Sequence, residues 1–517
     1  MIEGLGALRA RIRCRSMVGS PAIRGLQEVR LTPVPLQRPP RVEDKVAMSQ
    51  QRTVDPSQVI PFVEKFGYAL GDFASNLFWM PFILFGNFFY TDVFGISATA
   101  VGYMLLVTRI WDTVIDPVVG LIADRTRPRP GLGRYRPYLY WFALPFAVVC
   151  SIAFFSPNLG PMGKVVYAWV TYTGFCIVYS LINVPYSALM SVMSREPGER
   201  SSTSFFRMIG AQVAGLIISS GLMFFVAKIG GGNEQSQQQR GFFIVMTLFA
   251  LLAMVCLLVA GKLTRERITP DLKEKGDISK DLRNIIGCGA WWLLFLVSFF
   301  TIAAFTLRFG VAAYYFKYYA DPEAVKSWGL FQGGAVSAFF TLGTISALLG
   351  VIVFTFFAKT IDRKKMYYVL ILSSGLISIY FYYIPKQNIT TIIATQMLFS
   401  FLTGPTAAIL FAMYTDIAAY IRNQGASASN GLVMSAGSFA QKFGWAIGGS
   451  LTSILLGLAG YVANQPQSEH VQQIMRFMMS WAPMITCFIG AFFMMLYPLT
   501  AARMVQVTKE LAEKGLN

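Results

Sequence analysis

Residues 98–123 read ATAVGYMLLVTRIWDTVIDPVVGLIA, an apolar run that carries Asp112 and Asp116 near its middle. The run is long enough to cross a bilayer as a helix, and residues four apart lie on one face of a helix. A carboxylate near the bilayer centre costs roughly 2.5–3.5 kcal/mol on insertion scales. A helix with two carboxylates on one face therefore needs a compensating group, and we expect that group to be a bound cation.

The overall composition is that of a membrane protein. Of 517 residues, 55% are hydrophobic and only 14% are charged. The net charge of +18 falls mostly in the N-terminal tail and in short loops, so it favours a role in membrane topology over binding to nucleic acid. A single histidine, His470, and six cysteines without a spacing pattern leave little material for catalysis or metal binding. We therefore expect no enzyme, no metal site and no cofactor besides a coupling ion.

Twelve apolar segments follow one another, each long enough to cross a hydrocarbon layer of ~30 Å. Their approximate bounds are 66–91, 97–123, 137–157, 164–193, 204–228, 241–262, 290–318, 332–358, 366–385, 388–418, 430–462 and 471–500. A polar stretch at 264–283 divides them into two groups of six, a layout that resembles the major facilitator fold. We predict an all-α membrane protein with twelve transmembrane helices in two six-helix bundles.

The same segments give the expected domain organisation. Lys and Arg gather after the second segment, in the central loop and after the eighth segment, which predicts cytoplasmic termini and a multi-pass protein of the cell inner membrane. The tail lacks periodicity, so we expect it to be disordered and residues 1–47 to be dispensable, with Met48 as a later start. The expected units are a basic tail at 1–60, bundles at 61–262 and 290–500, a cytoplasmic central loop at 263–289 and a cytoplasmic C-terminal tail at 501–517.

Two loops at equivalent positions of the two halves carry an acid followed by a base. Asp124 and Arg125 follow the second segment, and Asp362 and Arg363 follow the eighth. We predict that these residues brace helix ends at the cytoplasmic face and change partners as the bundles move. The alternative, a basic loop that only sets topology, accounts for the bases but not for the acids.

Lys442 lies about twelve residues into the eleventh segment, too deep to reach water easily. We expect its ammonium to pair with Asp112 or Asp116, and Arg109 is a second base close to Asp112. If only one base is in reach, one carboxylate is surplus, and two carboxylates about 6 Å apart repel unless a cation or proton lies between them. The alternative is a lysine in a water-filled cavity without a fixed partner.

Three other segments carry polar residues. Asp72 lies in the first segment and Arg207 in the fifth, where the guanidinium would pair with Asp72 or hold a hydroxylated or anionic solute. In the fourth, Pro185 cannot donate to the carbonyl of Leu181, which leaves that oxygen and the Asn183 amide available to a ligand. The simpler readings are an interfacial carboxylate for Asp72, a topology anchor for Arg207 and a plain proline kink.

The motifs in these segments resemble those of the glycoside-pentoside-hexuronide:cation symporter family, over about 66–499. The matching stretches are GDFA at 71–74, FYTD at 89–92, RIWDTVIDP at 109–117, GRYRP at 133–137, NVPY at 183–186 and QK at 441–442. The resemblance implies sugar transport coupled to a cation, by alternating access between two bundles.

The resemblance also implies roles for individual residues. The cation site would comprise Asp112, Asp116, Ser180 and Asn183, with Lys442 as a movable counter-charge and Arg109 as a coupling residue. The substrate site would comprise Asp72, Asn76, Tyr186, Arg207 and Lys442. Two positions depart from the family pattern, because a sodium-using member has an aspartate in place of Asn183 and a tryptophan in place of Ser187.

We therefore predict a secondary active transporter that takes up a sugar, glycoside or uronide-like solute with H⁺ or Na⁺. The missing carboxylate at Asn183 favours protons, with Asp116 as the protonated group and Asp112 ionised near Lys442 or Arg109. The alternatives are a cation-coupled carrier of lysolipids or other amphiphiles and, less favoured, a channel or a transporter-like sensor. The expected partners are the solute, the coupling cation and the lipid bilayer, with no nucleic acid, and we expect a monomer.

Overall fold

The computed structural model is helical throughout the residues that it describes, which are 58–268, 278–326, 328, 334–357, 360–425 and 430–514. The expectations about a disordered tail and a later start at Met48 fall on 1–57, outside the described residues. At the beginning of the described chain, the Ile60 backbone N–H donates to Glu199 at 3.0 Å. The first described residues are therefore held against the start of the fifth membrane-crossing helix.

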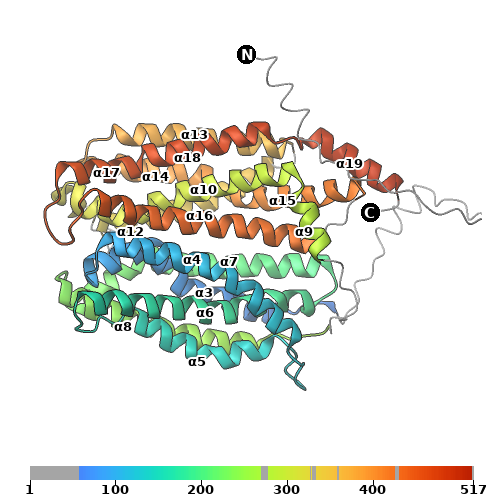
Figure 1. Ribbon diagram of the computed structural model, residues 1–517, viewed down its shortest axis with the longest axis horizontal. Coiled ribbons are helices and arrows are strands. Elements are labelled where there is room, and N and C mark those ends of the chain that lie inside the picture. The colour runs from blue at the N-terminus through green and yellow to red at the C-terminus, as the bar shows by residue number, and fades with distance from the viewer. Residues whose placement is uncertain are drawn as a thin grey trace, which may run out of the picture.

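The first six long helices lie together in the lower half of Figure 1. They are α3 (Phe62–Phe88), α4 (Ala98–Arg125), α5 (Arg136–Ala153), α6 (Pro161–Met193), α7 (Pro197–Gly230) and α8 (Gln235–Leu263). Segments from the second half of the chain form the upper half. They are α10 (Gly289–Tyr314), α12 (Gly334–Phe357), α13 (Arg363–Tyr382), α14 (Ile389–Thr403) with α15 (Thr406–Asn423), α16 (Asn430–Leu458), and α17 (Glu469–Met479) with α18 (Trp481–Leu496).

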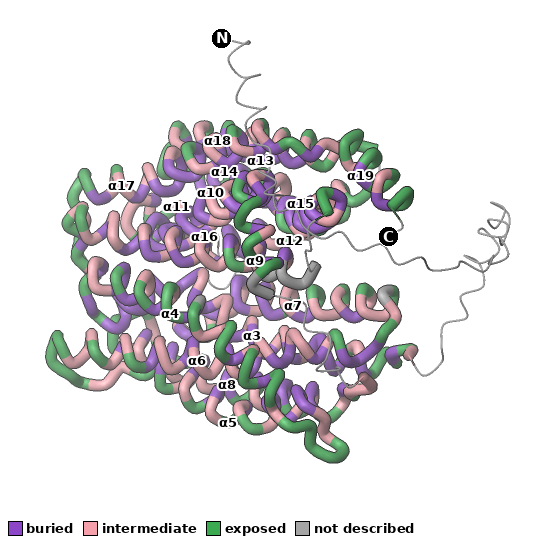
Figure 2. Tube along the Cα trace, turned by 45° about the vertical axis from the view of Figure 1, so that its right-hand side comes forward, coloured by how far each residue is buried: buried purple, intermediate pink, exposed green. Residues whose placement is uncertain are grey.

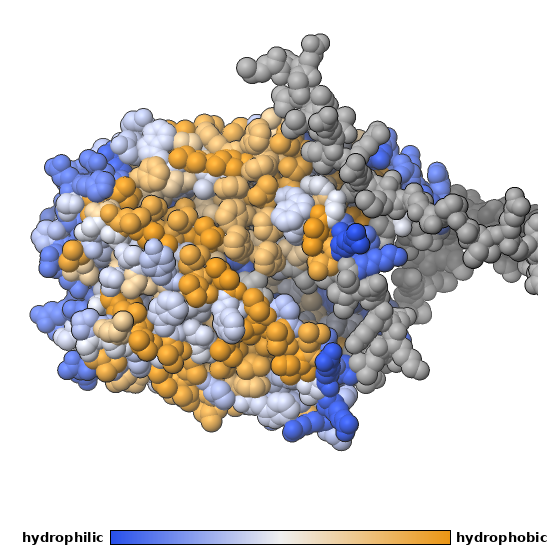
Figure 3. Space-filling model, in the orientation of Figure 1, coloured by the Kyte–Doolittle hydropathy of each residue, from blue (hydrophilic) through white to orange (hydrophobic). Residues whose placement is uncertain are grey.

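These helices confirm the predicted all-α membrane fold. Within the described residues, nine continuous spans are long and apolar enough to cross a membrane, and α3, α4 and α16 bring the crossings to twelve. These three helices are not among the nine apolar spans, and they carry charged residues: Asp72 in α3, Asp112 and Asp116 in α4, and Lys442 in α16. Apolar residues cover the middle of the face shown in Figure 3, between two hydrophilic ends. In Figure 2, buried and exposed positions alternate along single helices, as expected where one side faces lipid.

The tenth and twelfth segments differ in detail from the predicted single helices. The tenth breaks at Gly404 and Pro405, where a Cβ on Gly404 would lie 2.4 Å from the Ala347 carbonyl oxygen of α12. The twelfth breaks at Ser480, between α17 and α18. A further helix, α9 (Ile278–Ile286), forms inside the predicted central loop, and α19 (Ala501–Glu513) forms inside the predicted C-terminal tail.

The two halves meet mainly along three helix pairs. They are α4 with α16, α7 with α12, and α3 with α10. Numbered in the order in which they cross the membrane, these pairs are helices 2 and 11, 5 and 8, and 1 and 7. Helices 2 and 8 occupy equivalent positions in the two halves, and so do helices 5 and 11. The first two pairs are therefore equivalent in the repeat. The α4 and α16 backbones approach closely, because a Cβ on Gly457 would lie 2.7 Å from the Thr99 nitrogen. The packing therefore follows the repeat that the two groups of six segments indicated.

The GRYRP motif has a structural role at the start of α5. The Glu266 carboxylate, in the segment after α8, accepts backbone N–H bonds from Arg134 at 2.8 Å, Tyr135 at 2.7 Å and Arg136 at 2.9 Å. Gly133 has a positive φ of 80°, and a Cβ there would lie 2.3 Å from the Glu266 carboxyl carbon. An acid at a helix N-terminus satisfies donors that have no partner within the helix. Glu266 thus ties the central loop to α5.

We predict that Glu266→Ala lowers the stability of the purified protein by about 1–3 kcal/mol, because three backbone donors lose a charged acceptor. The measurement is the thermal unfolding midpoint in detergent, which should fall by several degrees. Arg265→Ala, at the exposed neighbouring position, is the matched control and should leave the midpoint unchanged. Equal midpoints for Glu266→Ala and the control would show that this cap contributes nothing.

Candidate functional site

Side chains from three helices gather between the two halves, near the middle of α4. Asp112 and Asp116 lie on α4, Ser180 on α6 and Lys442 on α16. The Lys442 ammonium forms an ion pair with Asp116 and lies 3.9 Å from Oδ2 of Asp112. The structure therefore places Lys442 between the halves, with a carboxylate partner, and not alone in a cavity.

Ser180 contacts both carboxylates at once. Its Oγ lies 2.7 Å from Oδ1 of Asp116 and 3.1 Å from Oδ1 of Asp112. A hydroxyl group has one hydrogen to donate, so it serves only one carboxylate at a time. The second oxygen contact is attractive only if that carboxyl group carries a proton or if a cation lies between the oxygens. The three oxygens are therefore arranged for the uptake of a positive charge.

Both carboxylates of the acidic pair lie within ion-pair distance of Lys442. The ammonium approaches Asp116 more closely than Asp112. The Asp112 side chain is the less accessible one, at 5% exposed against 22% for Asp116. Which of the two carries a proton, with Asp112 ionised near Lys442 or Arg109 as expected, stays a prediction.

Asn183 lies one turn after Ser180 on α6, and its Oδ1 is buried without a hydrogen-bond partner among the described residues. Pro185 follows it within α6, and Pro117 follows Asp116 within α4. Each proline lacks the N–H that would pair with the carbonyl four residues earlier. Both helices thus offer oxygen atoms without a helical donor close to the acidic pair, as a cation site requires.

Arg109 faces a different set of groups. Its guanidinium carbon lies 4.1 Å from the centre of the Trp79 ring and 5.7 Å from that of Tyr172. Trp79 is in turn stacked on Tyr179, with ring centres 4.9 Å apart. A guanidinium over an aromatic face is held by the ring quadrupole. Arg109 therefore extends the polar region from the acidic pair toward an aromatic layer.

Asp72 and Arg207 pair across α3 and α7, as the sequence indicated. The Arg207 Nε lies 3.2 Å from Oδ2 of Asp72, and its guanidinium carbon lies 5.4 Å from the centre of the Tyr186 ring. Tyr186 packs onto α3 because Gly71 leaves space, since a Cβ there would lie 2.3 Å from the ring. The Arg207 side chain keeps 28% of its surface exposed. The guanidinium is thus held by an acid and an aromatic ring of the first half and keeps an exposed surface.

Two further predicted site residues have structural partners. Asn76 donates to the Asp72 carbonyl at 2.8 Å, inside α3, so it does not share the Asp72 carboxylate. The Tyr186 hydroxyl donates to the Tyr68 carbonyl at 2.5 Å, and the Tyr68 hydroxyl donates to the Tyr186 carbonyl at 3.0 Å. Tyr186 therefore presents its ring face, and not its hydroxyl, to Arg207.

The predicted bracing residues lie at the end of the molecule that carries α19, and two of them connect helix ends there. Arg363 donates to both oxygens of Asp416, at 3.0 Å and 2.8 Å, and so joins α13 to α15. Asp362 caps α13 through the Lys364 N–H and accepts the Ala501 N–H of α19, each at 2.8 Å. These contacts stay within the second half of the molecule.

In the first half, Asp124 accepts a hydrogen bond from the Tyr135 hydroxyl at 2.9 Å, whereas Arg125 is exposed. Burial, together with the neighbouring Asp124 carboxylate, raises the pKa of Tyr135 to about 12, so this hydroxyl remains a donor at physiological pH. The two acid-base pairs in sequence are thus not pairs in space. Each residue instead has its own surroundings.

Sequence reasoning missed an aromatic layer between the acidic pair and the far end of the helices. A cavity of about 30 Å³, room for a water but not for a sugar, lies between the halves there. Its lining includes Trp79 and Asn87 of α3, Thr306 of α10 and Trp445 of α16. The sequence did contain a signal for this layer. Trp79 follows Asp72 by seven residues and Trp445 follows Lys442 by three, and such spacings place each tryptophan on the same helix face as the charged residue.

Comparison with known proteins places this geometry in context. A family model described as MFS/sugar transport protein matches residues 67–501. A putative glycoside/cation symporter of Escherichia coli (strain K12) is 33% identical over 450 residues, covering 87% of this chain and 94% of that protein. The isoprimeverose transporter of Lactiplantibacillus pentosus is 32% identical over 452 residues, covering 87% and 91%.

Solved structures agree on the fold. A crystal structure of a D-xylose-proton symporter matches with a TM-score of 0.57 at 12% identity, covering 84% of this chain and 95% of that chain. A bacterial homologue of the human lysosomal transporter Spinster matches with a TM-score of 0.60 at 11% identity, covering 87% and 97%. At such identities the likeness concerns the fold alone.

The ion pair between α4 and α16 gives a prediction about stability. Lys442→Met should lower the thermal midpoint, with a loss of about 1–3 kcal/mol, because Asp116 is left without its ammonium in a partly exposed site. Adding Asp116→Asn to Lys442→Met should restore part of that loss. The measurement is a double-mutant cycle of midpoints in detergent.

Lys386→Met, in an exposed loop, is the control for removing a lysine anywhere in the chain. Losses that simply add in the double variant would show that Lys442 and Asp116 do not interact.

Proposed function

The chain belongs to the family of MFS/sugar transport proteins, and we propose that it moves a sugar or glycoside across a membrane together with a cation. It is a multi-pass membrane transporter and not an enzyme. The observation that carries the coupling proposal is the Ser180 hydroxyl, which lies between two carboxylates and has one hydrogen for both. A proton or metal cation from solution would supply the positive charge that the second carboxylate contact lacks.

The cation site contains residues from both halves, so movement of the halves changes its geometry. Asp112, Asp116 and Ser180 belong to the first half, and Lys442 belongs to the second. A positive charge that enters the acidic pair competes with the ammonium for Asp116, so it weakens an ion pair that joins the halves. Ion and substrate then influence each other through one shared conformational equilibrium, typically by about 1–3 kcal/mol.

The polar groups on the other side of the site suit a hydroxylated solute. Arg207 and Asp72 offer charged donors and acceptors in the first half, while Trp445 offers an aromatic ring from the second half. A sugar ring has hydroxyl groups at its edge and apolar C–H groups on its faces, so it needs both kinds of contact. Isoprimeverose and other pentosides are the first candidates, because a relative that is 32% identical carries that name.

We propose protons as the main coupling ion and Asp116 as the group that carries them. Sodium prefers several oxygen ligands with negative charge to offset its dehydration, whereas a proton needs a single carboxylate. Asn183 supplies a neutral oxygen where a sodium-using member of the family has a carboxylate. We also propose that both termini lie in the cytoplasm, on the basis of the distribution of Lys and Arg. We further propose that the protein is a monomer and that it lies in the cell inner membrane.

The test is uptake of labelled isoprimeverose and a panel of pentosides and glucuronides into proteoliposomes under an imposed proton or sodium gradient. The wild type should accumulate substrate when the outside is acidic, and a protonophore should abolish the accumulation. Asp116→Asn mimics the protonated acid permanently, so it should equilibrate substrate across the membrane without concentrating it. The absence of uptake for every panel member would disprove sugar transport.

The ion assignment has its own control. Asn183→Asp adds the missing carboxylate and should strengthen sodium stimulation, which we expect to be weak in the wild type. Strong saturable activation of the wild type by sodium, without a dependence on external pH, would overturn proton coupling.

A second prediction concerns substrate affinity. Asp72→Asn and Arg207→Met should each weaken binding by about 2 kcal/mol, roughly thirtyfold, because each leaves the opposite charge without its partner. The measurement is equilibrium binding of the substrate identified by uptake. Lys228→Met, at an exposed position on the same helix as Arg207, should bind like the wild type. Unchanged affinity in both site variants would move the substrate site elsewhere.

A further inference from the structure

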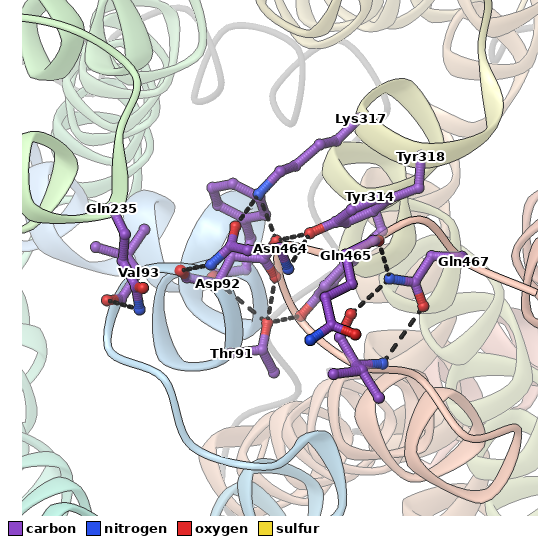
Figure 4. Close-up of polar contacts among 12 residues, drawn as sticks. Thr91, Asp92, Val93, Gln235, Tyr314, Lys317, Tyr318, Asn464, Gln465 and Gln467 are labelled. Carbon is purple, nitrogen blue, oxygen red and sulfur yellow. Dashed lines mark hydrogen bonds and ion pairs between the residues drawn. The ribbon is translucent and has the colours of Figure 1, made fainter.

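A second charged cluster lies at the end of the molecule opposite α19. Asp92 is 1% exposed, and its carboxylate is surrounded by side chains from the other half of the molecule. We call Asp92, Lys317, Tyr318, Tyr461 and Asn464 the outer clasp (Figure 4). None of these residues has a place in the cation or substrate sites described above.

The Asp92 carboxylate is fully occupied. Its Oδ1 accepts from the Lys317 ammonium at 2.6 Å and from the Tyr318 hydroxyl. Its Oδ2 accepts from the Tyr461 hydroxyl at 2.6 Å and from the neighbouring Thr91 hydroxyl at 2.7 Å. Charge-assisted hydrogen bonds of this kind are the strong ones in proteins, and more so where water is excluded.

Asn464 contacts three other members of the outer clasp. Its amide donates to the Asp92 carbonyl at 2.7 Å and its Oδ1 accepts from Lys317 at 2.7 Å. Its backbone N–H donates to the Tyr318 hydroxyl at 2.9 Å. Asn464 has a φ of 59°, in the left-handed region that non-glycine residues seldom adopt. The surrounding contacts thus hold the residue in an unfavourable backbone conformation.

The clasp joins the two halves at equivalent places. Asp92 lies in the π-helical turn η2 (Phe89–Val93) at the end of the first helix, and Lys317 lies in the π-helical turn η3 (Tyr315–Tyr319) at the end of the seventh. Single π turns occur mostly at functional sites. The same irregularity therefore occurs twice in the repeat, with an acid in one half and a base in the other.

The interface beneath the clasp is also closed. The Asn87 amide of α3 donates to the Gly449 carbonyl of α16 at 3.3 Å, and Ser453 donates to Oδ1 of Asn87 at 2.9 Å. Closer to the middle of the molecule, the Lys442 side chain remains 38% exposed, whereas Asn87 and Ser453 are buried. The halves are therefore in closer contact at the end with the clasp.

We infer that the outer clasp is the extracytoplasmic gate of this transporter and that Asp92 and Lys317 must separate in each cycle before a solute can enter from outside. A buried carboxylate and ammonium that part must both be rehydrated, so the clasp favours the state that is closed to the outside. The inference rests on the two-bundle fold and on the proposed orientation with both termini in the cytoplasm, and it does not depend on the identity of the sugar or ion.

The test measures access to the interface from outside, without substrate or gradient. Ser450 lines the small cavity beneath the clasp and is buried, so Ser450→Cys is a reporter whose reaction with a membrane-impermeant maleimide requires an open outer end. The parent chain, whose five described cysteines are buried, gives the blank rate in intact cells. Adding Lys317→Gln to the reporter should raise the labelling rate at least fivefold.

Two further variants make the result specific to the clasp. Tyr461→Phe removes one hydroxyl donor to Asp92 and should raise the rate about two- to threefold, less than Lys317→Gln, because the ion pair of Asp92 with Lys317 stays in place. It also keeps the test decisive if Lys317→Gln does not fold. Lys164→Gln is the matched control, because Lys164 lies at the same end but donates to Phe94 at 3.1 Å within the first half.

The control should label at the reporter's own rate. Labelling of Lys317→Gln and Tyr461→Phe at that same rate would overturn the gate, and an equal increase in Lys164→Gln would show general loosening instead.

Discussion

A charge inside a membrane-spanning helix costs free energy unless another group compensates it, and this constraint decides which helices pack together here. Asp72 of α3 is compensated by Arg207 of α7, and Asp116 of α4 by Lys442 of α16. Arg308 shows another solution, because its fully buried guanidinium lies 4.5 Å from the centres of two phenyl rings and donates to a glutamine. Stability and function therefore draw on the same few side chains.

The compensating groups differ in which parts of the molecule they connect. Asp72 and Arg207 join helices of one half, so they can act as part of a rigid surface. Lys442 crosses to the other half in the middle of the interface, and Lys317 crosses at its outer end. Ionic contacts that cross the interface are the ones that motion must break. In the proposed cycle, the contacts of Lys317 and Lys442 are therefore the ionic ones that respond to movement of the halves.

The sequence allowed the helices, the twofold repeat and the pairing of Lys442 with an acid to be predicted, because apolar segment length and the cost of buried charge are local properties. Asp72 and Arg207 were likewise expected as a pair. The partners of Asp92 were not predictable, since they depend on two π-helical turns and on the backbone of Asn464 in a loop. Nor was the Arg363 pairing with Asp416, because facing loops are brought together only by the packed bundle.

The depth of the acidic pair has an electrical consequence. Asp112 and Asp116 are the fifteenth and nineteenth of the 28 residues of α4, so a cation that reaches them from either end of the helix has entered the membrane. A cation carried inward through the whole field gains roughly 2.3 kcal/mol for each 100 mV of potential. In the proposed cycle, transport of a neutral sugar is therefore electrogenic. An energised cell can accumulate such a sugar by voltage even when the ion is equally concentrated on both sides.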